Sequence, residues 1–227
     1  MASLPGTTGN TAVVLIDPYN DFLHSSGKLN PLVSASMEKT NTLTHLKEFV
    51  TTARAHKIPI YYGLHQQAGE NFILGWQHAT PMQQSQGKSG AFAAGTWGVE
   101  IFEGLEPSKE NGDVVVSKHW SSRQVPLPFD LGGMKCADEM TSSFQNTDLD
   151  YQLRQRDVAN VVIGGLTANT CMESTARYAY ELGYNVTMLK DCSAGFTIEA
   201  AEAATELIWP LFAHRVLTVA EWTASLK

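Results

Sequence analysis

The sequence predicts an α/β fold of three layers, in which helices cover both faces of a mostly parallel sheet. The first observation is that short apolar runs rich in β-branched residues alternate along the chain with longer segments of helical periodicity. The second is that the run Thr11–Ile16 lacks polar alternation, which is typical of a strand buried on both faces. Because strands separated by helices of this length are joined by right-handed crossovers, we expect neighbouring strands to be parallel.

The remaining elements follow in order. A helix is expected over residues 31–56, where leucine, phenylalanine and valine recur at helical spacing between Leu43 and Ala53 before Pro59 ends the pattern. Further strands are expected at residues 58–64, 113–116, 161–163, 185–189 and 215–218, and further helices at residues 147–156, 170–183 and 197–207. Two segments, 65–97 and 120–140, fit neither period. Loops of that length in a compact domain are typical of lids over a site or of subunit contacts.

Composition and charge exclude several classes of protein. The 227 residues carry a formal net charge of -7, with 43% hydrophobic and 17% charged residues, as in an ordinary globular protein. This length supports one well-buried core, so we expect a single domain over residues 1–227. Lysine and arginine form no cluster, so we expect no nucleic-acid partner. No apolar run reaches the roughly 18 residues of a membrane-spanning helix, so we expect no membrane segment.

The three cysteines and the first residues bear on the compartment. Cysteines without C-x-x-C spacing exclude a disulfide framework and a cysteine-rich zinc module, and they fit a reducing environment. We interpret Cys136 and Cys192 as structural or incidental. Residues 1–10 hold neither a basic nor an apolar segment, so we expect no cleaved signal peptide and a cytoplasmic location. Export by an unconventional route would leave no trace in the sequence.

Cys171 is the most informative residue of the chain. It follows the strand expected at 161–163, and Asn169 or Thr170 is the expected N-cap of the next helix, so the thiol lies in the first helical turn. The positive end of the helix dipole and the unpaired N–H groups there favour thiolate over thiol, which is what a nucleophile requires. The alternative is that Cys171 is a small core residue, as free cysteines often are.

Two more chemically active residues follow predicted strands. Asp17 comes directly after the first strand, and Lys118 follows the strand at 113–116. Since the carboxyl ends of parallel strands share one edge, where open α/β sheets bind ligands, we expect carboxylate, ammonium and thiol to meet over one crevice. The carboxylate can take the thiol proton, and the ammonium can hold both groups in charged form. Taken singly, Asp17 could be a turn residue and Lys118 a solvated surface residue, so the prediction depends on their joint placement.

Four motifs carry a resemblance that covers nearly the whole chain. In order they are Val14-Leu15-Ile16-Asp17-Pro18-Tyr19-Asn20-Asp21-Phe22, then Ser117-Lys118, then Ser143-Phe144 with Thr147-Asp148-Leu149, and then Gly164-Gly165-Leu166-Thr167-Ala168-Asn169-Thr170-Cys171. With them the chain resembles the isochorismatase-like cysteine hydrolase superfamily, which includes nicotinamidases, N-carbamoylsarcosine amidase, ureide-type hydrolases and isochorismatase. Each motif alone is weak, whereas their combination in this order is specific.

The resemblance has consequences for fold and site. It implies a Rossmann-like, six-stranded sheet, and it implies that Asp17, Lys118 and Cys171 form the catalytic triad. It also implies a cis peptide bond between Leu166 and Thr167. By the same resemblance, the backbone N–H groups of Thr167 and Cys171 form an oxyanion hole, in which each donor contributes about 3 kcal/mol.

Two departures from the family pattern concern the pocket. Tyr19 stands where many relatives have glutamine, which is expected to alter the pocket floor. Nicotinamidases bind zinc through an Asp-x-His pair after the second strand and a more distant histidine, whereas the aligned residues here are Gly63, Leu64 and His65. A weaker metal site with His78 is the alternative, but histidines in a polar loop are more often solvated. We therefore predict no metal, no cofactor and no nicotinamidase activity.

Three functions compete. The resemblance favours a hydrolase of a small amide, ureide or carbamoyl compound, in which Asp17 deprotonates Cys171, the thiolate attacks the carbonyl, and water releases the acyl-enzyme. The second is isochorismatase activity, which hydrolyses the vinyl ether of isochorismate to a dihydroxybenzoate precursor and pyruvate. It needs a proton donor and no nucleophilic sulfur, so Cys171 favours acyl chemistry. The third is a non-catalytic binding domain, which predicts the loss of the acid, the amine or the thiol, and none is missing.

Aromatic residues and apolar segments suggest a pocket and an assembly. The candidates for the pocket wall are Phe22, Trp76, Trp97 and Trp120, which would supply apolar contact and exclude water. Core packing is the alternative for each. Because relatives by resemblance are dimers, tetramers or larger, we expect a homo-oligomer, dimer or tetramer, with residues 120–140 and 209–212 as candidate contacts.

Overall fold

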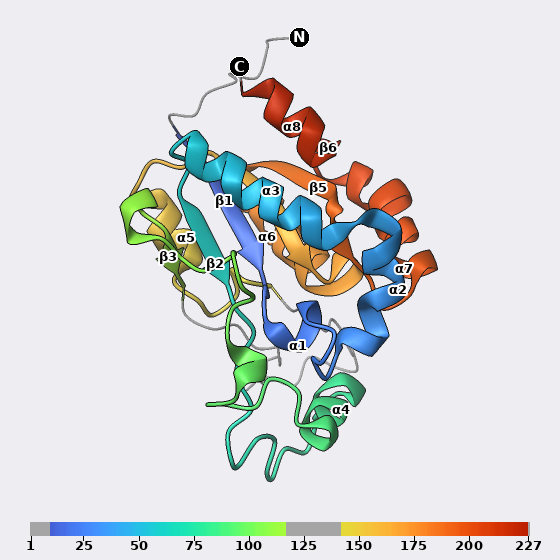
Figure 1. The fold of residues 1–227 in the computed structure, drawn as a ribbon. Coiled ribbons are helices and arrows are strands. Elements are labelled where there is room, and N and C mark those ends of the chain that lie inside the picture. Colours follow the sequence, from blue (N-terminus) through green and yellow to red (C-terminus); the bar gives the residue numbers. More distant parts are fainter. Residues whose placement is uncertain (1–9, 117–141, 227) are drawn as a thin grey trace, which may run out of the picture.

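Six parallel strands form one sheet in the order β3-β2-β1-β4-β5-β6 (Figure 1). The computed structural model describes residues 10–116 and 142–226. The strands are β1 (Thr11–Ile16), β2 (Ile60–Gly63), β3 (Val114–Val115), β4 (Asn160–Leu166), β5 (Asn185–Ala194) and β6 (Arg215–Leu217). The order runs outward from β1 in both directions, as in Rossmann-like sheets. The prediction of a three-layer α/β fold with a parallel sheet is confirmed.

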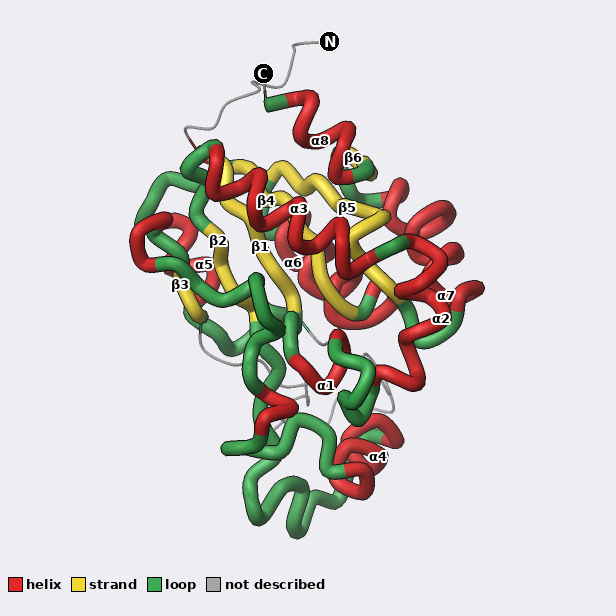
Figure 2. The backbone as a smooth tube through the Cα atoms, viewed as in Figure 1, coloured by secondary structure: helices red, strands yellow, loops and turns green. Residues whose placement is uncertain are grey.

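Helices surround this sheet (Figure 2). They are α1 (Asn20–Leu23), α2 (Asn30–Thr40), α3 (Thr42–Ala55), α4 (Pro81–Ser89), α5 (Leu149–Arg154), α6 (Glu173–Glu181), α7 (Ile198–Glu202) and α8 (Val219–Ser225). Shorter or irregular helical segments are η2 (Trp97–Val99), η3 (Lys109–Asn111), η4 (Ala168–Met172), η5 (Ala203–Ile208) and η6 (Trp209–Leu211).

The side chains of β1 alternate between two hydrophobic clusters, one on each face of the sheet. Val13 and Leu15 pack in the cluster formed with α2, α3 and α8. Val14 and Ile16 pack in the cluster formed with α5, α6 and α7. All four side chains are fully buried, so β1 is apolar because both of its faces are covered.

The helix expected over residues 31–56 is in fact two helices. Asn41 separates α2 from α3 with a φ of 51°, and its N–H caps α2 on the carbonyls of Met37 and Glu38. Asparagine is one of the few residues that adopt this left-handed conformation readily, which explains why the chain turns here.

Strand β4 continues beyond the expected end at Ile163. Gly165 has a φ of 126°, and a Cβ atom there would lie 2.2 Å from the carbonyl oxygen of Ile16. The register of β4 against β5 shifts between Ile163 and Gly165, which marks a local irregularity of the strand. Glycine therefore permits the close approach of β1 and β4 and carries the chain to Thr167 at the sheet edge.

Part of the segment predicted to contact other subunits lies in the core. Trp209 and Phe212 are buried in the cluster beneath α5, α6 and α7, whereas Leu211 is 77% exposed. Cys192 is buried in the opposite cluster, and Cys136 lies outside the described residues. Of the helices that the structure describes, none combines the length and the hydropathy needed to cross a bilayer.

Candidate active site

Asp17 is held rigidly where β1 ends. Its N–H donates to the carbonyl of Gly63 at the end of β2 (2.9 Å), and its own carbonyl accepts from Tyr19 N–H (2.7 Å). The φ of 47° is tolerated better by aspartate than by most residues. The side chain is fully buried, and Oδ1 accepts a hydrogen bond of 2.6 Å from the N–H of His65. The turn after β1 and the turn after β2 thus fix one carboxylate at the carboxyl edge of the sheet.

Tyr19 and His65 support this carboxylate from behind. The Tyr19 hydroxyl donates to the His65 carbonyl (3.0 Å), and His65 Nδ1 lies 2.8 Å from the carbonyl of Gln66. Burial, and next the negative charge of Asp17, raise the pKa of Tyr19 well above its usual value, so the hydroxyl stays protonated. We expected Tyr19 to alter the pocket floor, but it does not line the cavity. Its ring packs against Phe92, which does, with the two ring centroids 5.4 Å apart.

Cys171 lies in the first turn after β4. The helix begins at Ala168 in η4 and continues as α6, with Thr167 as its N-cap. It therefore starts two or three residues earlier than the caps expected at Asn169 or Thr170. The carbonyl of Thr167 accepts from the N–H groups of Thr170 and Met172, both at 3.2 Å, which closes the turn without a side-chain cap. The Leu166–Thr167 peptide bond is cis.

Threonine hydroxyls surround Cys171, which is 6% exposed. Thr170 Oγ1 donates to the Cys171 sulfur at 3.7 Å and is itself hydrogen-bonded to the Thr167 hydroxyl. On the core side, Thr175 Oγ1 donates to the Cys171 carbonyl (2.7 Å) and accepts from the N–H of Ser143 (3.0 Å). A hydroxyl donor directed at sulfur favours the thiolate, because it stabilises the charged form.

Asp17 and Cys171 line the same cavity of about 200 Å³. Thr167, Thr170 and His65 complete the side formed by the sheet edge. Helix α4, which lies beyond the carboxyl end of β1 together with α1 (Figure 1), forms another side. The apolar lining consists of Phe22, Leu29, Leu32, Met82, Ala91, Phe92 and Phe196. An acid and a thiol thus share a small, largely apolar chamber, where electrostatic interactions are stronger than in water.

A buried carboxylate holds one wall of this cavity in place. Asp21 Oδ2 accepts from the N–H of Phe92 (2.7 Å), and Oδ1 accepts from the N–H of Lys28 (3.2 Å). The Phe92 ring packs against Phe22 and His65, with centroids 5.2 Å and 5.0 Å away. The aromatic side of the cavity is therefore anchored through the main chain of Phe92. No sequence pattern had indicated Phe92 as a residue of the site.

Other residues predicted for the site lie elsewhere or outside the described ranges. Phe22 lines the cavity, but Trp76 and Trp97 do not. The Trp97 ring packs on His24, 4.7 Å between centroids, and is 45% exposed, while the Trp76 ring lies 6.3 Å from Phe72. Lys118 and Trp120 lie outside the described residues.

Within residues 10–116 and 142–226, no three His, Cys, Asp or Glu side chains are grouped so that they could hold a metal ion. His65 lies in the cavity wall, and His78 is exposed in the segment between β2 and α4. The absence of a metal and of a cofactor stays a prediction.

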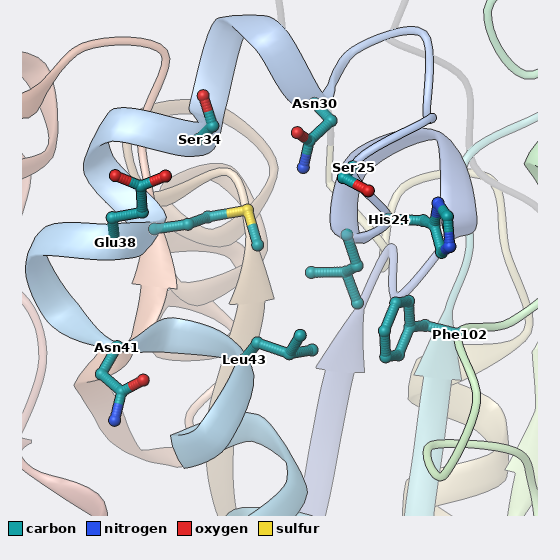
Figure 3. Close-up of a pocket in the computed structure, with 10 residues that line it drawn as sticks. His24, Ser25, Asn30, Ser34, Glu38, Asn41, Leu43 and Phe102 are labelled. Atoms are coloured by element: carbon teal, nitrogen blue, oxygen red, sulfur yellow. The ribbon is translucent and has the colours of Figure 1, made fainter.

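A second hollow, of about 380 Å³, lies apart from these residues between α2, the start of α3 and the loop after α1 (Figure 3). His24 and Phe102 lie on one side of it and Glu38 on the other. His24 Nδ1 accepts a hydrogen bond of 3.0 Å from the N–H of Ser26. Neither Asp17 nor Cys171 lines this hollow, so both predicted residues belong to the smaller cavity.

Known proteins are similar to this chain in sequence. The isochorismatase domain model matches residues 11–124 and 138–221. Ureidoacrylate amidohydrolase RutB of Rhizobium rhizogenes is 26% identical over 227 residues, which cover 96% of this chain and 83% of that protein. An uncharacterised isochorismatase family protein of Bacillus subtilis, YwoC, is 41% identical over 105 residues, which cover 46% of this chain and 55% of YwoC.

Solved structures share the fold. A cysteine hydrolase from Pseudomonas syringae pv. phaseolicola superposes with a TM-score of 0.73 at 24% identity, over 100% of this chain and 98% of that one. N-carbamoylsarcosine amidase from Thermoplasma acidophilum gives a TM-score of 0.57 at 20% identity, over 92% and 96% of the two chains. At these identities the likeness shows the architecture alone.

Proposed function

The chain belongs to the isochorismatase family, and from this premise we propose that it is a cysteine hydrolase that cleaves the C–N bond of a small amide, ureide or carbamoyl compound. The observation that carries the proposal is the convergence of Asp17 and Cys171 on one cavity, although they follow different strands. The ureidoacrylate amidohydrolases among the relatives support C–N cleavage as the reaction class.

In the proposed mechanism, Asp17 acts first as base and then as acid. Because Oδ1 accepts the N–H of His65, we assign proton transfer to Oδ2. The carboxylate takes the thiol proton, the Cys171 sulfur attacks the substrate carbonyl, and the protonated Asp17 gives its proton to the departing nitrogen. Water, deprotonated by the same carboxylate, then hydrolyses the thioester. Lys118, which lies outside the described residues, keeps the role of charge partner that the resemblance gives it.

The oxyanion that forms during attack needs donors beside the sulfur. We assign this part to the backbone N–H groups of Thr167 and Cys171, at the start of the turn that bears the nucleophile. The proposal is supported by the position of both residues in the cavity wall. Each donor would contribute about 3 kcal/mol to the transition state.

The experiment that tests this function compares Cys171→Ala and Asp17→Ala with the wild type on a panel of small amides, ureides and isochorismate. We expect Cys171→Ala to abolish amide turnover and Asp17→Ala to do the same. Vinyl ether hydrolysis that survives in Cys171→Ala and disappears in Asp17→Ala would assign isochorismatase activity instead. Slow alkylation of Cys171 that does not depend on pH would favour a non-catalytic binding domain.

We also propose that the chain forms a homo-oligomer, a dimer or a tetramer. Leu207 and Leu211, which lie on η5 and η6, are 67% and 77% exposed and would gain from burial against a second copy. Size-exclusion chromatography with light scattering gives the mass directly, and a monomer at micromolar concentration would contradict the proposal.

A further inference from the structure

Helix α4 presents one face to the cavity. Met82, Ser85 and Gln86 line it, and their spacing of three and four residues places them on one side of the helix. Asp17 and Cys171 line the side formed by the sheet edge. A ligand whose reacting carbonyl lies at the sulfur is therefore bounded by α4 as well.

The three glutamines of α4 differ in how their amides are used. Gln83 closes the capping box with Thr80, its Oε1 accepting the Thr80 N–H at 2.9 Å. Gln84 Nε2 donates to the carbonyl of Ala79 at 3.0 Å. Gln86 is 7% exposed, and among the residues that the structure describes its buried Nε2 has no hydrogen-bond partner. An unpaired buried amide is unfavourable in the free protein and requires an explanation, and here the residue that bears it lines the cavity.

The main chain around Gln86 is nevertheless fixed. Its carbonyl accepts from the N–H of Gly90 (3.0 Å) and from the Ser89 hydroxyl (3.2 Å). The Gly90 carbonyl in turn accepts from Lys28 Nζ at 2.6 Å, which ties the end of α4 to the loop after α1. Gln86 is thus held in the cavity wall on a capped helix, with little freedom for its amide to find a partner elsewhere in the protein.

We infer that the Gln86 amide determines specificity by donating a hydrogen bond to an acceptor oxygen of the substrate remote from the scissile carbonyl. This inference rests on the proposed amide hydrolysis and deepens it. The substrates are small amides that carry a second carbonyl on a short apolar linker. A site whose buried polar group is paired only by the substrate discriminates against analogues that lack the matching group.

The probes are neutral pairs that differ only in the second amide group, which supplies the acceptor oxygen. Malonamide, succinamide and glutaramide are each compared with the monoamide of equal length in which an isopropyl group replaces the second amide. These are 3-methylbutanamide, 4-methylpentanamide and 5-methylhexanamide. The ratio of kcat/KM within each pair measures the preference for the acceptor. Dissociation constants measured by calorimetry in the Cys171→Ala background give the same preference without turnover.

Gln86→Met keeps the length of the side chain and removes its donor, and Gln84→Met is the matched control on the exposed side of α4. For the diamide that the wild type cleaves with the highest kcat/KM, we expect a clear preference over the matched monoamide. Gln86→Met should reduce that preference about tenfold, both in kcat/KM and in the dissociation constants. Its melting temperature should be unchanged or higher, because an unpaired buried amide has been removed. Gln84→Met should keep the preference.

Three outcomes would overturn the inference. They are a wild type that prefers the monoamides or binds no diamide, a Gln86→Met variant that keeps the wild-type preference, and a Gln86→Met variant that unfolds more easily and loses activity on both members of every pair. The last would show that the amide is structural. If amides are not hydrolysed at all while the binding preference persists and depends on Gln86, the proposed reaction is wrong and the recognition stands.

Discussion

Replacing Asp21 by Asn tests whether one buried carboxylate holds the cavity wall in place. Asp21 accepts the N–H of Phe92 on one oxygen and that of Lys28 on the other. Gly98 packs so closely that a Cβ there would lie 2.4 Å from Asp21 Oδ1. Asparagine has the same shape but only one acceptor atom, so one buried N–H must face an NH₂ group. Losing one hydrogen bond to a charged acceptor and leaving its donor unpaired should lower the free energy of unfolding by about 3 kcal/mol.

The assay is urea unfolding at pH 7, followed by tryptophan fluorescence, with Asp157→Asn as the control. Asp157 is exposed, so its substitution should change the free energy of unfolding by less than about 0.5 kcal/mol. Asp21→Asn should also raise KM for an amide substrate, because the Phe92 ring loses its anchor. A change in Asp21→Asn no larger than that in the control would refute the role given to this carboxylate.

Three further predictions concern the nucleophile, the buried tyrosines and the sheet. Thr170→Val, which removes the donor to the Cys171 sulfur, should slow iodoacetamide alkylation at pH 7 about tenfold in a Cys136→Ser background, whereas Thr170→Ser should not. Burial raises the pKa of Tyr19 and Tyr62, so the folded protein keeps both protons where the unfolded chain releases them. Their contribution to the free energy of unfolding should therefore be complete below about pH 10 and be lost as the pH rises above it. Unfolding curves measured across this range check this, and the loss should be smaller in Tyr19→Phe than in the wild type. Gly165→Ala should lower the free energy of unfolding by at least about 3 kcal/mol, because a Cβ there meets a β1 carbonyl at 2.2 Å, and a loss under about 1 kcal/mol would contradict the close packing.

The sheet and the edge that bears Asp17 and Cys171 were predictable because they follow from local periodicity and one topological rule. The apolar run of β1 is buried on both faces, as its pattern predicts. The strand-end rule for parallel sheets, applied to Asp17 and Cys171, leads to two residues that line one cavity. Neither conclusion required knowledge of the loops.

The walls of the cavity were not predictable, since they depend on tertiary contacts. Helix α4 contains few apolar residues, and it is held by the capping box at Thr80 and by the Lys28 contact at its end. The presence of a tryptophan in the sequence does not show which way its ring faces: Trp97 packs on His24 and does not line the cavity. Phe92 lies in the wall because a distant carboxylate binds its main chain. The capping box of Thr80 and Gln83, with Pro81 at the helix start and Gly90 at its end, was the sequence signal that could have revealed α4.

Acid-quenched mass spectrometry of the protein during turnover of a small amide tests the central claim most directly. If the Cys171 sulfur attacks the carbonyl, the intact chain should gain the mass of the acyl group, and peptide mapping should place it on Cys171. The adduct should be absent in Cys171→Ala, together with turnover. Amide hydrolysis that continues in Cys171→Ala would contradict the account.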